Sequence, residues 1–165
     1  MNTRFGPIGH LARRFFTSLW PGGPPAADDR WARSFLADRE VALWEQMSGP
    51  DRRHAVAVAR RLGPVEPVAV PAALLHDVGK VESRLGPLRR AIVTVAALAA
   101  GRDRLAAGSG RAARYLRHDA LGADLLAGAG SDRLTVTWAR EHHLPPERWT
   151  VPAPLGRALK AADDD

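Results

Sequence analysis

The sequence contains no cysteine, and this absence excludes several kinds of site. Without thiols the chain can form no disulfide framework, no iron–sulfur cluster and no cysteine-ligated zinc site, and it has no thiol nucleophile. Any metal site must therefore be built from histidine, aspartate and glutamate side chains. Six histidines are present among the 165 residues, so their placement is the most informative feature of the chain.

Long hydrophobic runs are also missing. The longest apolar stretch, residues 91–100, is about half as long as a helix that crosses a bilayer. The first residues lack the apolar centre and the small-residue cleavage site of a secretory signal. With 45% hydrophobic and 25% charged residues, the composition is typical of one globular domain. We therefore expect a cytoplasmic protein without a transmembrane segment.

Lysine is scarce, although the net charge is +6. Only Lys80 and Lys160 are lysines, and the other basic residues are arginines spread along a chain that is also rich in alanine. This combination is typical of a GC-rich genome, so the charge is weak support for a nucleic-acid partner. A small anionic molecule, such as a phosphate ester, fits the same charge at least as well.

No segment alternates apolar and polar residues with the period of a β-strand, and the pattern predicts an all-α fold. Capping residues, glycines and prolines divide the chain into expected helices. These helices cover residues 28–47, 51–62, 72–78, 87–100, 110–117, 119–128, 131–143 and 154–162. Ser131 is the expected N-cap of the helix that ends near His143.

A proline- and glycine-rich run, residues 21–25, separates an N-terminal arm from the rest of the chain. The expected division is an arm over residues 1–27 and a single domain over residues 28–165. The arm is expected to be flexible or loosely docked, or else to form a short amphipathic segment anchored by Phe15, Phe16 and Trp20. Such a segment would cap a neighbouring subunit, which leaves a homo-oligomer open, or touch a membrane surface.

The apolar helix that begins near Ala72 ends in an adjacent imidazole and carboxylate, His76 and Asp77. Burying these two groups is costly unless something such as a bound cation offsets their lost hydration. Adjacent helical residues point about 100° apart, so both can reach one ion only near a helix end. Gly79 provides that end.

The other histidines also fall on successive expected helices, at or near their ends. The full series is His54, His76-Asp77, His118, His142-His143 and, on the last helix, Asp163. Only His10, in the arm, lies outside it. Imidazoles and carboxylates without thiolates suit Mn, Fe, Co, Ni or Zn ions.

This series resembles the HD-domain superfamily of metal-dependent phosphohydrolases. The matching segments are "LLHDVGK", "RHDALGADLL", "AREHH" and "LKAAD", together with His54, and the resemblance runs from about residue 50 to 164. It implies an all-α helical bundle with a dinuclear metal site between helices. The chain departs from the HD-GYP branch, because residues 144–149 read Leu-Pro-Pro-Glu-Arg-Trp. It also departs from trinuclear variants, because Pro50 stands where they carry a glutamate.

The resemblance also assigns roles to individual residues. One divalent ion would be held by His54, His76, Asp77 and Asp163, and Asp77 would bridge to a second ion held by His118 and His142. The choice between His142 and His143 stays open, with the other residue supporting a ligand or contacting substrate. Asp164 is an alternative ligand to Asp163. The implied catalytic residues are Asp77, His76 and Lys80, and the candidate phosphate contacts are Lys80, Arg52 and Arg53.

The function that the resemblance implies is hydrolysis of a nucleotide or another small phosphate ester by a metal-activated water. Two ions sharing a carboxylate can activate that water and clamp a phosphoryl oxygen. Two alternatives use the same ligands. The first is an HD-fold mixed-valent di-iron oxygenase, and the second is a non-catalytic nucleotide-binding regulatory module.

Overall fold

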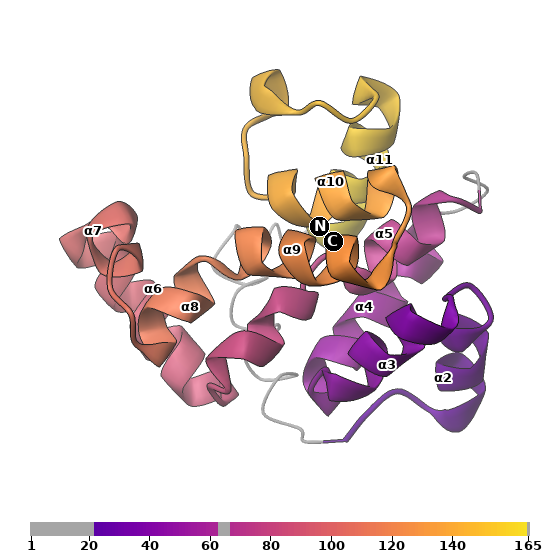
Figure 1. The fold of residues 1–165 in the computed structure, drawn as a ribbon, viewed down its shortest axis with the longest axis horizontal. Coiled ribbons are helices and arrows are strands. Elements are labelled where there is room, and N and C mark those ends of the chain that lie inside the picture. The colour runs from indigo at the N-terminus through magenta and orange to yellow at the C-terminus, as the bar shows by residue number, and fades with distance from the viewer. Residues whose placement is uncertain (1–21, 63–66, 165) are drawn as a thin grey trace, which may run out of the picture.

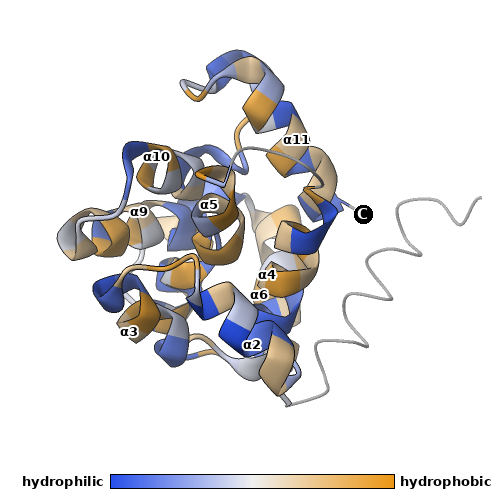
Figure 2. Cartoon of the chain, turned by 90° about the vertical axis from the view of Figure 1, so that its right-hand side faces the viewer, coloured by the Kyte–Doolittle hydropathy of each residue, from blue (hydrophilic) through white to orange (hydrophobic). Residues whose placement is uncertain are grey.

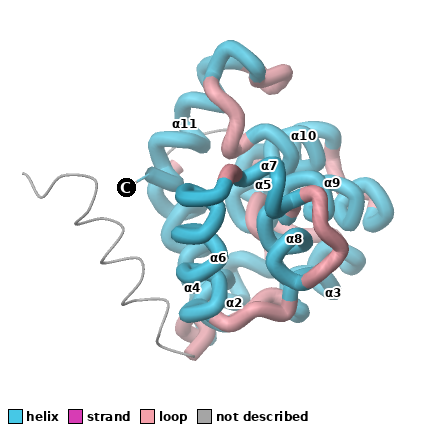
Figure 3. The backbone as a smooth tube through the Cα atoms, turned by 90° about the vertical axis from the view of Figure 1, so that its left-hand side faces the viewer, coloured by secondary structure: helices cyan, strands magenta, loops and turns pink. Residues whose placement is uncertain are grey.

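The structure, a computed structural model, describes residues 22–62 and 67–164. Within this part of the chain every regular element is a helix and there is no strand (Figure 3), so the predicted all-α fold is confirmed. The helices are α2 (Ala26–Arg33), α3 (Asp38–Gln46), α4 (Gly49–Arg61), α5 (Ala69–Leu75), η1 (Val78–Ser83), α6 (Pro87–Ala100), α7 (Arg102–Ala106), α8 (Arg111–Leu116), α9 (His118–Ala129), α10 (Arg133–Glu141), η2 (Pro146–Arg148) and α11 (Ala153–Asp164). None of these described helices is both long and apolar enough to span a membrane.

Helix α5 is the centre of the fold. It packs against α4 on one side and α10 on another, and α9 packs along α10 (Figure 2). Every residue of α5 except Pro71 is buried, which explains why its sequence has no polar face. Its alanines let the neighbouring helices approach closely, and each fully buried leucine, Leu74 and Leu75, contributes about 1.5–3 kcal/mol.

The N-terminal helical region differs from the prediction. A single helix over residues 28–47 is wrong, because the chain forms two helices, α2 and α3. The Glu40 carboxylate accepts a hydrogen bond from the Ala37 backbone N–H at 2.9 Å and so begins a new helix there. Helix α2 then folds back, and its Asp29 accepts hydrogen bonds from the Trp44 indole at 3.0 Å and from Arg52 at 3.2 Å.

Helix caps account for other differences in bounds. The predicted break at Ser48-Gly49-Pro50 is the start of α4, because the Ser48 hydroxyl accepts the Asp51 backbone N–H. Asp132, not the predicted Ser131, caps α10 by accepting the Leu134 N–H at 2.8 Å. The short helices η1, α7 and η2 have too few residues for a periodic pattern, and the sequence did not predict them.

The described chain has two unequal parts. Helices α4, α5, α9, α10 and α11 surround the core, whereas α6, α7 and α8 lie together at one end of the molecule (Figure 1). The predicted division into an arm and a domain stays a prediction, because residues 1–21 lie outside the described residues.

Candidate metal centre

The fold brings the histidine and aspartate series together from five separate segments. His54 lies on α4, His76-Asp77 at the junction of α5 and η1, His118 at the start of α9, His142-His143 after α10, and Asp163 in the last turn of α11. Their ligand atoms form two groups, and within each group all of these atoms lie within 4.8 Å of one another. One group is Asp77, His118, His142 and His143, and the other is His54, His76 and Asp163.

Asp77 lies between the two groups. Its Oδ1 atom is 3.3 Å from His118 Nε2 and 3.8 Å from His142 Nε2, whereas its Oδ2 atom is 3.4 Å from His76 Nε2. The two carboxylate oxygens therefore face different groups, as a bridging ligand requires. In the second group, Asp163 Oδ1 lies 3.0 Å from His54 Nε2 and 3.7 Å from His76 Nε2.

Backbone contacts fix the tautomers of three imidazoles. The Nδ1 atoms of His76, His118 and His142 lie 2.9, 2.7 and 2.9 Å from the carbonyl oxygen three residues earlier in the chain. A carbonyl only accepts hydrogen bonds, so each Nδ1 carries a proton and donates it. The Nε2 lone pair of each ring is therefore directed into the cluster.

Two of these Nε2 atoms, those of His76 and His142, are buried and have no hydrogen-bond partner among the described residues. Both residues are almost completely inaccessible to solvent. A buried nitrogen that is left unpaired, whether as acceptor or as donor, costs about 1–3 kcal/mol. A divalent cation would satisfy both lone pairs, so the residues present fit the metal site that the sequence predicts.

The charges around Asp77 keep it ionised. Burial alone would raise its pKa, but Lys80, His76 and His118 outweigh burial and hold the pKa of Asp77 well below its usual range. Lys80 donates a hydrogen bond to Asp77 Oδ2. Burial would lower the pKa of Lys80, but Asp77 and Asp51 raise it above its usual value. The pair is therefore an anion and a cation at neutral pH.

The imidazoles respond in opposite directions. Burial would lower the pKa of His76, but the carboxylates of Asp77 and Asp163 raise it. Burial and the neighbouring rings of His143 and His76 hold the pKa of His142 well below its usual value. Lost hydration and His118 lower the pKa of His143 to about 4.

Two glycines allow η1 to lie directly on the first turn of α9. A Cβ atom on Gly79 would overlap the His118 carbonyl oxygen, and one on Gly122 would lie 3.0 Å from the Gly79 nitrogen. This close approach brings Asp77, just before η1, beside His118, the first residue of α9. The glycines in the "HDVGK" and "RHDALGA" segments therefore position two of the candidate ligands.

Glu141 is a positioning residue that sequence reasoning missed. Its buried carboxylate accepts hydrogen bonds from the Thr150 N–H at 2.7 Å and the Thr150 hydroxyl at 2.6 Å. Its backbone carbonyl oxygen lies 3.2 Å from the Trp149 indole nitrogen, which donates to it. These bonds hold the loop after the double histidine. No sequence pattern indicated this role, because a glutamate at a helix end is usually exposed.

The remaining predicted site residues lie in different surroundings. Lys80 is at the cluster, whereas Arg52 donates to Asp29 at 3.2 Å and Arg53 donates to the Gly22 carbonyl oxygen. Both arginines therefore contact the start of the described chain. Asp164 is exposed and pairs with Lys160 at 2.8 Å, outside both ligand groups.

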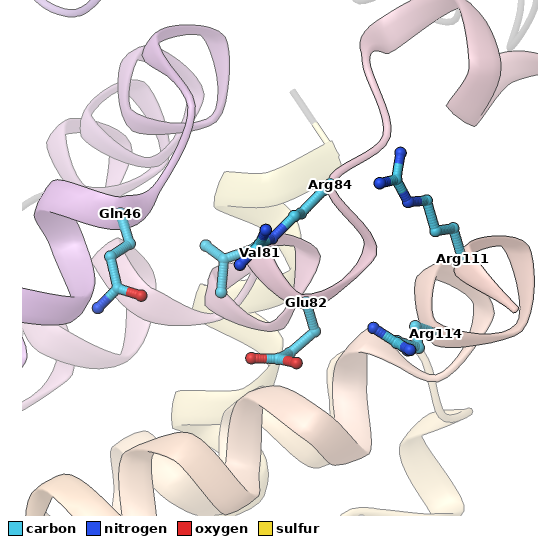
Figure 4. Close-up of a pocket in the computed structure, with 6 residues that line it drawn as sticks. All are labelled: Gln46, Val81, Glu82, Arg84, Arg111 and Arg114. Atoms are coloured by element: carbon cyan, nitrogen blue, oxygen red, sulfur yellow. The ribbon is translucent and has the colours of Figure 1, made fainter. Parts of the chain in front are cut away.

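A cavity of about 550 Å³ opens between α3, η1 and α8. It is lined by Gln46, Val81, Glu82, Arg84, Arg111 and Arg114 (Figure 4). No ion pair joins these three arginines to another described residue, and the lining includes one carboxylate, that of Glu82, so the lining residues carry a net positive charge. Sequence reasoning did not single them out, because arginines are spread along the whole chain.

A comparison with protein-family models identifies the family. The model described as HD domain matches residues 53–164, more than half of the chain, and this range includes every candidate ligand. Searches of the curated proteins and of the solved structures gave no significant match. The order of the ligands, their convergence in the fold and the family match agree: the chain belongs to the HD domain family.

Proposed function

We propose that this chain is a metal-dependent phosphohydrolase that acts on a nucleotide or another small phosphate ester. Membership in the HD domain family supports a metal-dependent hydrolase-type activity. The observation that carries the proposal is the pair of buried, unpartnered Nε2 atoms of His76 and His142 on either side of Asp77. Such an arrangement is costly in a purely structural cluster and favourable around cations.

The proposed ligand sets follow the two groups. His54, His76, Asp77 and Asp163 would hold one ion, and Asp77, His118 and His142 would hold the other. The donors are nitrogens and carboxylate oxygens, which suit Mn, Fe, Co, Ni or Zn. His143 is a neighbour of His118, with 3.2 Å between their Nε2 atoms, and it would adjust the second set or contact substrate.

When bound, two such ions would lower the pKa of a water molecule and neutralise charge on a phosphoryl oxygen. The residues of this chain prepare the site for that chemistry. Asp77 stays ionised because Lys80 offsets its burial. Lys80 keeps its positive charge within the cluster, where its ammonium can orient Asp77 or contact a phosphate oxygen. The three Nδ1–H bonds keep the imidazole lone pairs in place without reorganisation.

The test is metal analysis of the purified protein combined with a phosphate-release screen across nucleotides and simple phosphate esters. Asp77→Ala should lose bound metal and activity together. Asp124→Ala is the matched control, because Asp124 is exposed and pairs with Arg140 at the surface, away from both ligand groups. If Asp77→Ala retains both its metal content and its activity, the proposal is wrong.

The same assay separates the two alternatives. Turnover that requires dioxygen and yields no phosphate would favour an oxygenase, whereas phosphate release under anaerobic conditions would exclude one. Tight nucleotide binding in the presence of Mn²⁺ or Fe²⁺ without turnover would favour a regulatory module. No feature of the described residues favours either alternative over hydrolysis.

A further inference from the structure

Helix α6 carries an apolar face that is exposed to solvent. Leu88, Ile92, Val95 and Leu98 have exposed fractions of 60, 60, 66 and 84%. Their spacing of four, three and three residues places them on one side of the helix. A continuous row of large exposed apolar side chains is unusual on a soluble domain and marks a surface that another element covers. We call these four residues the α6 face.

The opposite side of α6 holds it to the domain. Arg90 donates to both carboxylate oxygens of Asp51 on α4, at 2.7 and 2.8 Å, and Ala97 is buried. The Thr94 hydroxyl lies 3.3 Å from the hydroxyl of Tyr115 on α8. The main neighbours of α6 are α7 and α8 (Figure 3). Among the described residues, none of these attachments uses the α6 face.

The sequence before the described chain has a complementary pattern. Residues 1–21 lie outside the described residues. Within them Ile8, Ala12, Phe15 and Leu19 are spaced by four, three and four residues, which places them on one side of a helix. Leu11 and Phe16 flank this row, and Arg13, Arg14 and Thr17 lie on the other side. Pro7 suits the first turn of such a helix.

The lengths and the attachment points also agree. Residues 7–20 match α6 in number of residues, 14, and each would be about 21 Å long as a helix. The described chain begins beside the first turns of α4, where the Gly22 carbonyl accepts a hydrogen bond from Arg53. Arg90 attaches the start of α6 to the same turns through Asp51. The arm therefore enters the domain near the N-terminal end of α6.

We propose that residues 7–20 form an amphipathic helix that packs antiparallel on the α6 face of the same chain. In this register Leu19 lies near Leu88, Phe15 near Ile92, and Ile8 near Leu98. The tether favours this occupant, because a segment joined a few residues away has an effective concentration in the millimolar range. Arg13 and Arg14 stay in water, so no charge is buried.

Disulfide trapping tests the register, because the natural chain contains no other thiol. Each variant carries two cysteines. The four positions that are replaced within the described chain, Leu88, Ile92, Leu98 and Ala127, are exposed, so the substitutions should preserve the fold. The expected pairs are Phe15→Cys with Ile92→Cys, and Ile8→Cys with Leu98→Cys. The first control is Phe15→Cys with Ala127→Cys on α9. The second is Ile8→Cys with Leu88→Cys, which would pair well only if the arm packed parallel to α6.

Under mild oxidation the expected pairs should form an intramolecular disulfide at least tenfold faster than both controls. Equal rates for expected and control pairs would overturn the proposal, because they would indicate an arm without a fixed position. Disulfide-linked dimers would overturn it in favour of a second copy as the occupant. Binding of the unsubstituted chain to vesicles of anionic phospholipid, together with no preferred disulfide, would overturn it in favour of a membrane surface.

Amide hydrogen exchange gives a second measurement without cysteines. In the unsubstituted full-length chain, the amides of residues 8–20 should exchange at least tenfold more slowly than in a synthetic peptide of residues 1–21. The protection should disappear in the variant Ile92→Asp with Val95→Asp and persist in Arg89→Asp, which changes charge beside the α6 face. Protection that survives the double variant would contradict the proposal.

Discussion

The two halves of the candidate metal centre use the same residue types but hold protons differently. In the half around His142, burial and the neighbouring rings of His143 and His76 outweigh the single carboxylate of Asp77, so the pKa of His142 falls well below its usual value. In the half around His76, the carboxylates of Asp77 and Asp163 face one buried ring, and its pKa rises. The ratio of carboxylates to imidazoles, rather than burial alone, decides which half is ready to accept a cation.

This difference concerns the apo protein, in which protons and cations compete for the same lone pairs. His142 and His143 are neutral at neutral pH, so their half offers free donors. His76 holds a proton more strongly, so its half must release one before its Nε2 atom can bind.

The largest effect should separate two adjacent histidines. His142 is buried with an unpartnered Nε2 atom, whereas His143 is exposed at the edge of the cluster. His142→Ala should lower phosphate release by about 10³-fold, since several kcal/mol of charge stabilisation are lost. His143→Ala should lower it by about 10-fold. Initial rates at saturating metal measure both losses. A larger loss in His143→Ala would make His143 the ligand and His142 its neighbour.

Gly79→Ala should disturb the half that contains Asp77 and His118. The added methyl group would overlap the His118 carbonyl oxygen, so η1 must move away from α9 at a cost of about 1–3 kcal/mol or more. Thermal or urea unfolding measures the loss. Gly128→Ala on the same α9 is the control, because nothing lies within 4 Å of the added atom, and it should be neutral or stabilise by up to about 1 kcal/mol. Equal stability of the two variants would show that the close approach is unimportant.

Metal loading should depend on pH in two stages. The pKa of His76 is raised, so below that pKa a proton occupies this half and metal affinity there should fall about tenfold per pH unit. The pKa of His143 is lowered to about 4 and Asp77 stays ionised, so these two groups should not oppose binding in the other half until the pH approaches 4. Calorimetric titration with Mn²⁺ at pH 8, 7 and 6 should change from two equivalents to one. If both equivalents of Mn²⁺ were lost over the same pH range, the two halves would not differ in how strongly they hold protons.

The smallest effect should be at the end of α11. Asp163 faces His54 and His76, whereas Asp164 is exposed and pairs with Lys160. Asp164→Ala should change metal affinity by less than about twofold, in line with the small worth of an exposed ion pair. Asp163→Ala should remove one of the two equivalents. Metal analysis after dialysis compares the two variants. A loss confined to Asp164→Ala would show that Asp164, rather than Asp163, is the ligand.

The resemblance to the HD-domain superfamily implied which side chains would converge, because the histidines and aspartates follow the order of that family's ligands. It did not predict their partners. The Nδ1 bonds to carbonyl oxygens depend on the exact ring orientation, and the Lys80–Asp77 pair depends on the turn into η1. His142 and His143 are neighbours in sequence and identical in type, so the sequence does not distinguish them, whereas the structure does through the burial of His142 and its Nδ1 bond to a carbonyl oxygen.

The fold shows the same limit. Periodicity gave α6 with its correct bounds, since a helix is a local structure. It did not reveal that the row from Leu88 to Leu98 is exposed in the described structure, because the burial of a helix face depends on where the other helices pack. The break between α2 and α3 was missed for a related reason: Glu40 begins a new helix within an apolar pattern that is continuous in sequence.

The wide separation of the candidate ligands along the chain has a consequence for folding. A cation held by residues that range from His54 to Asp163 would tie distant segments together in a protein that has no disulfide. Every tenfold rise in free metal above the dissociation constant would then stabilise the folded state by about 1.4 kcal/mol per site. The supply of metal would set the lifetime of this protein as well as its activity.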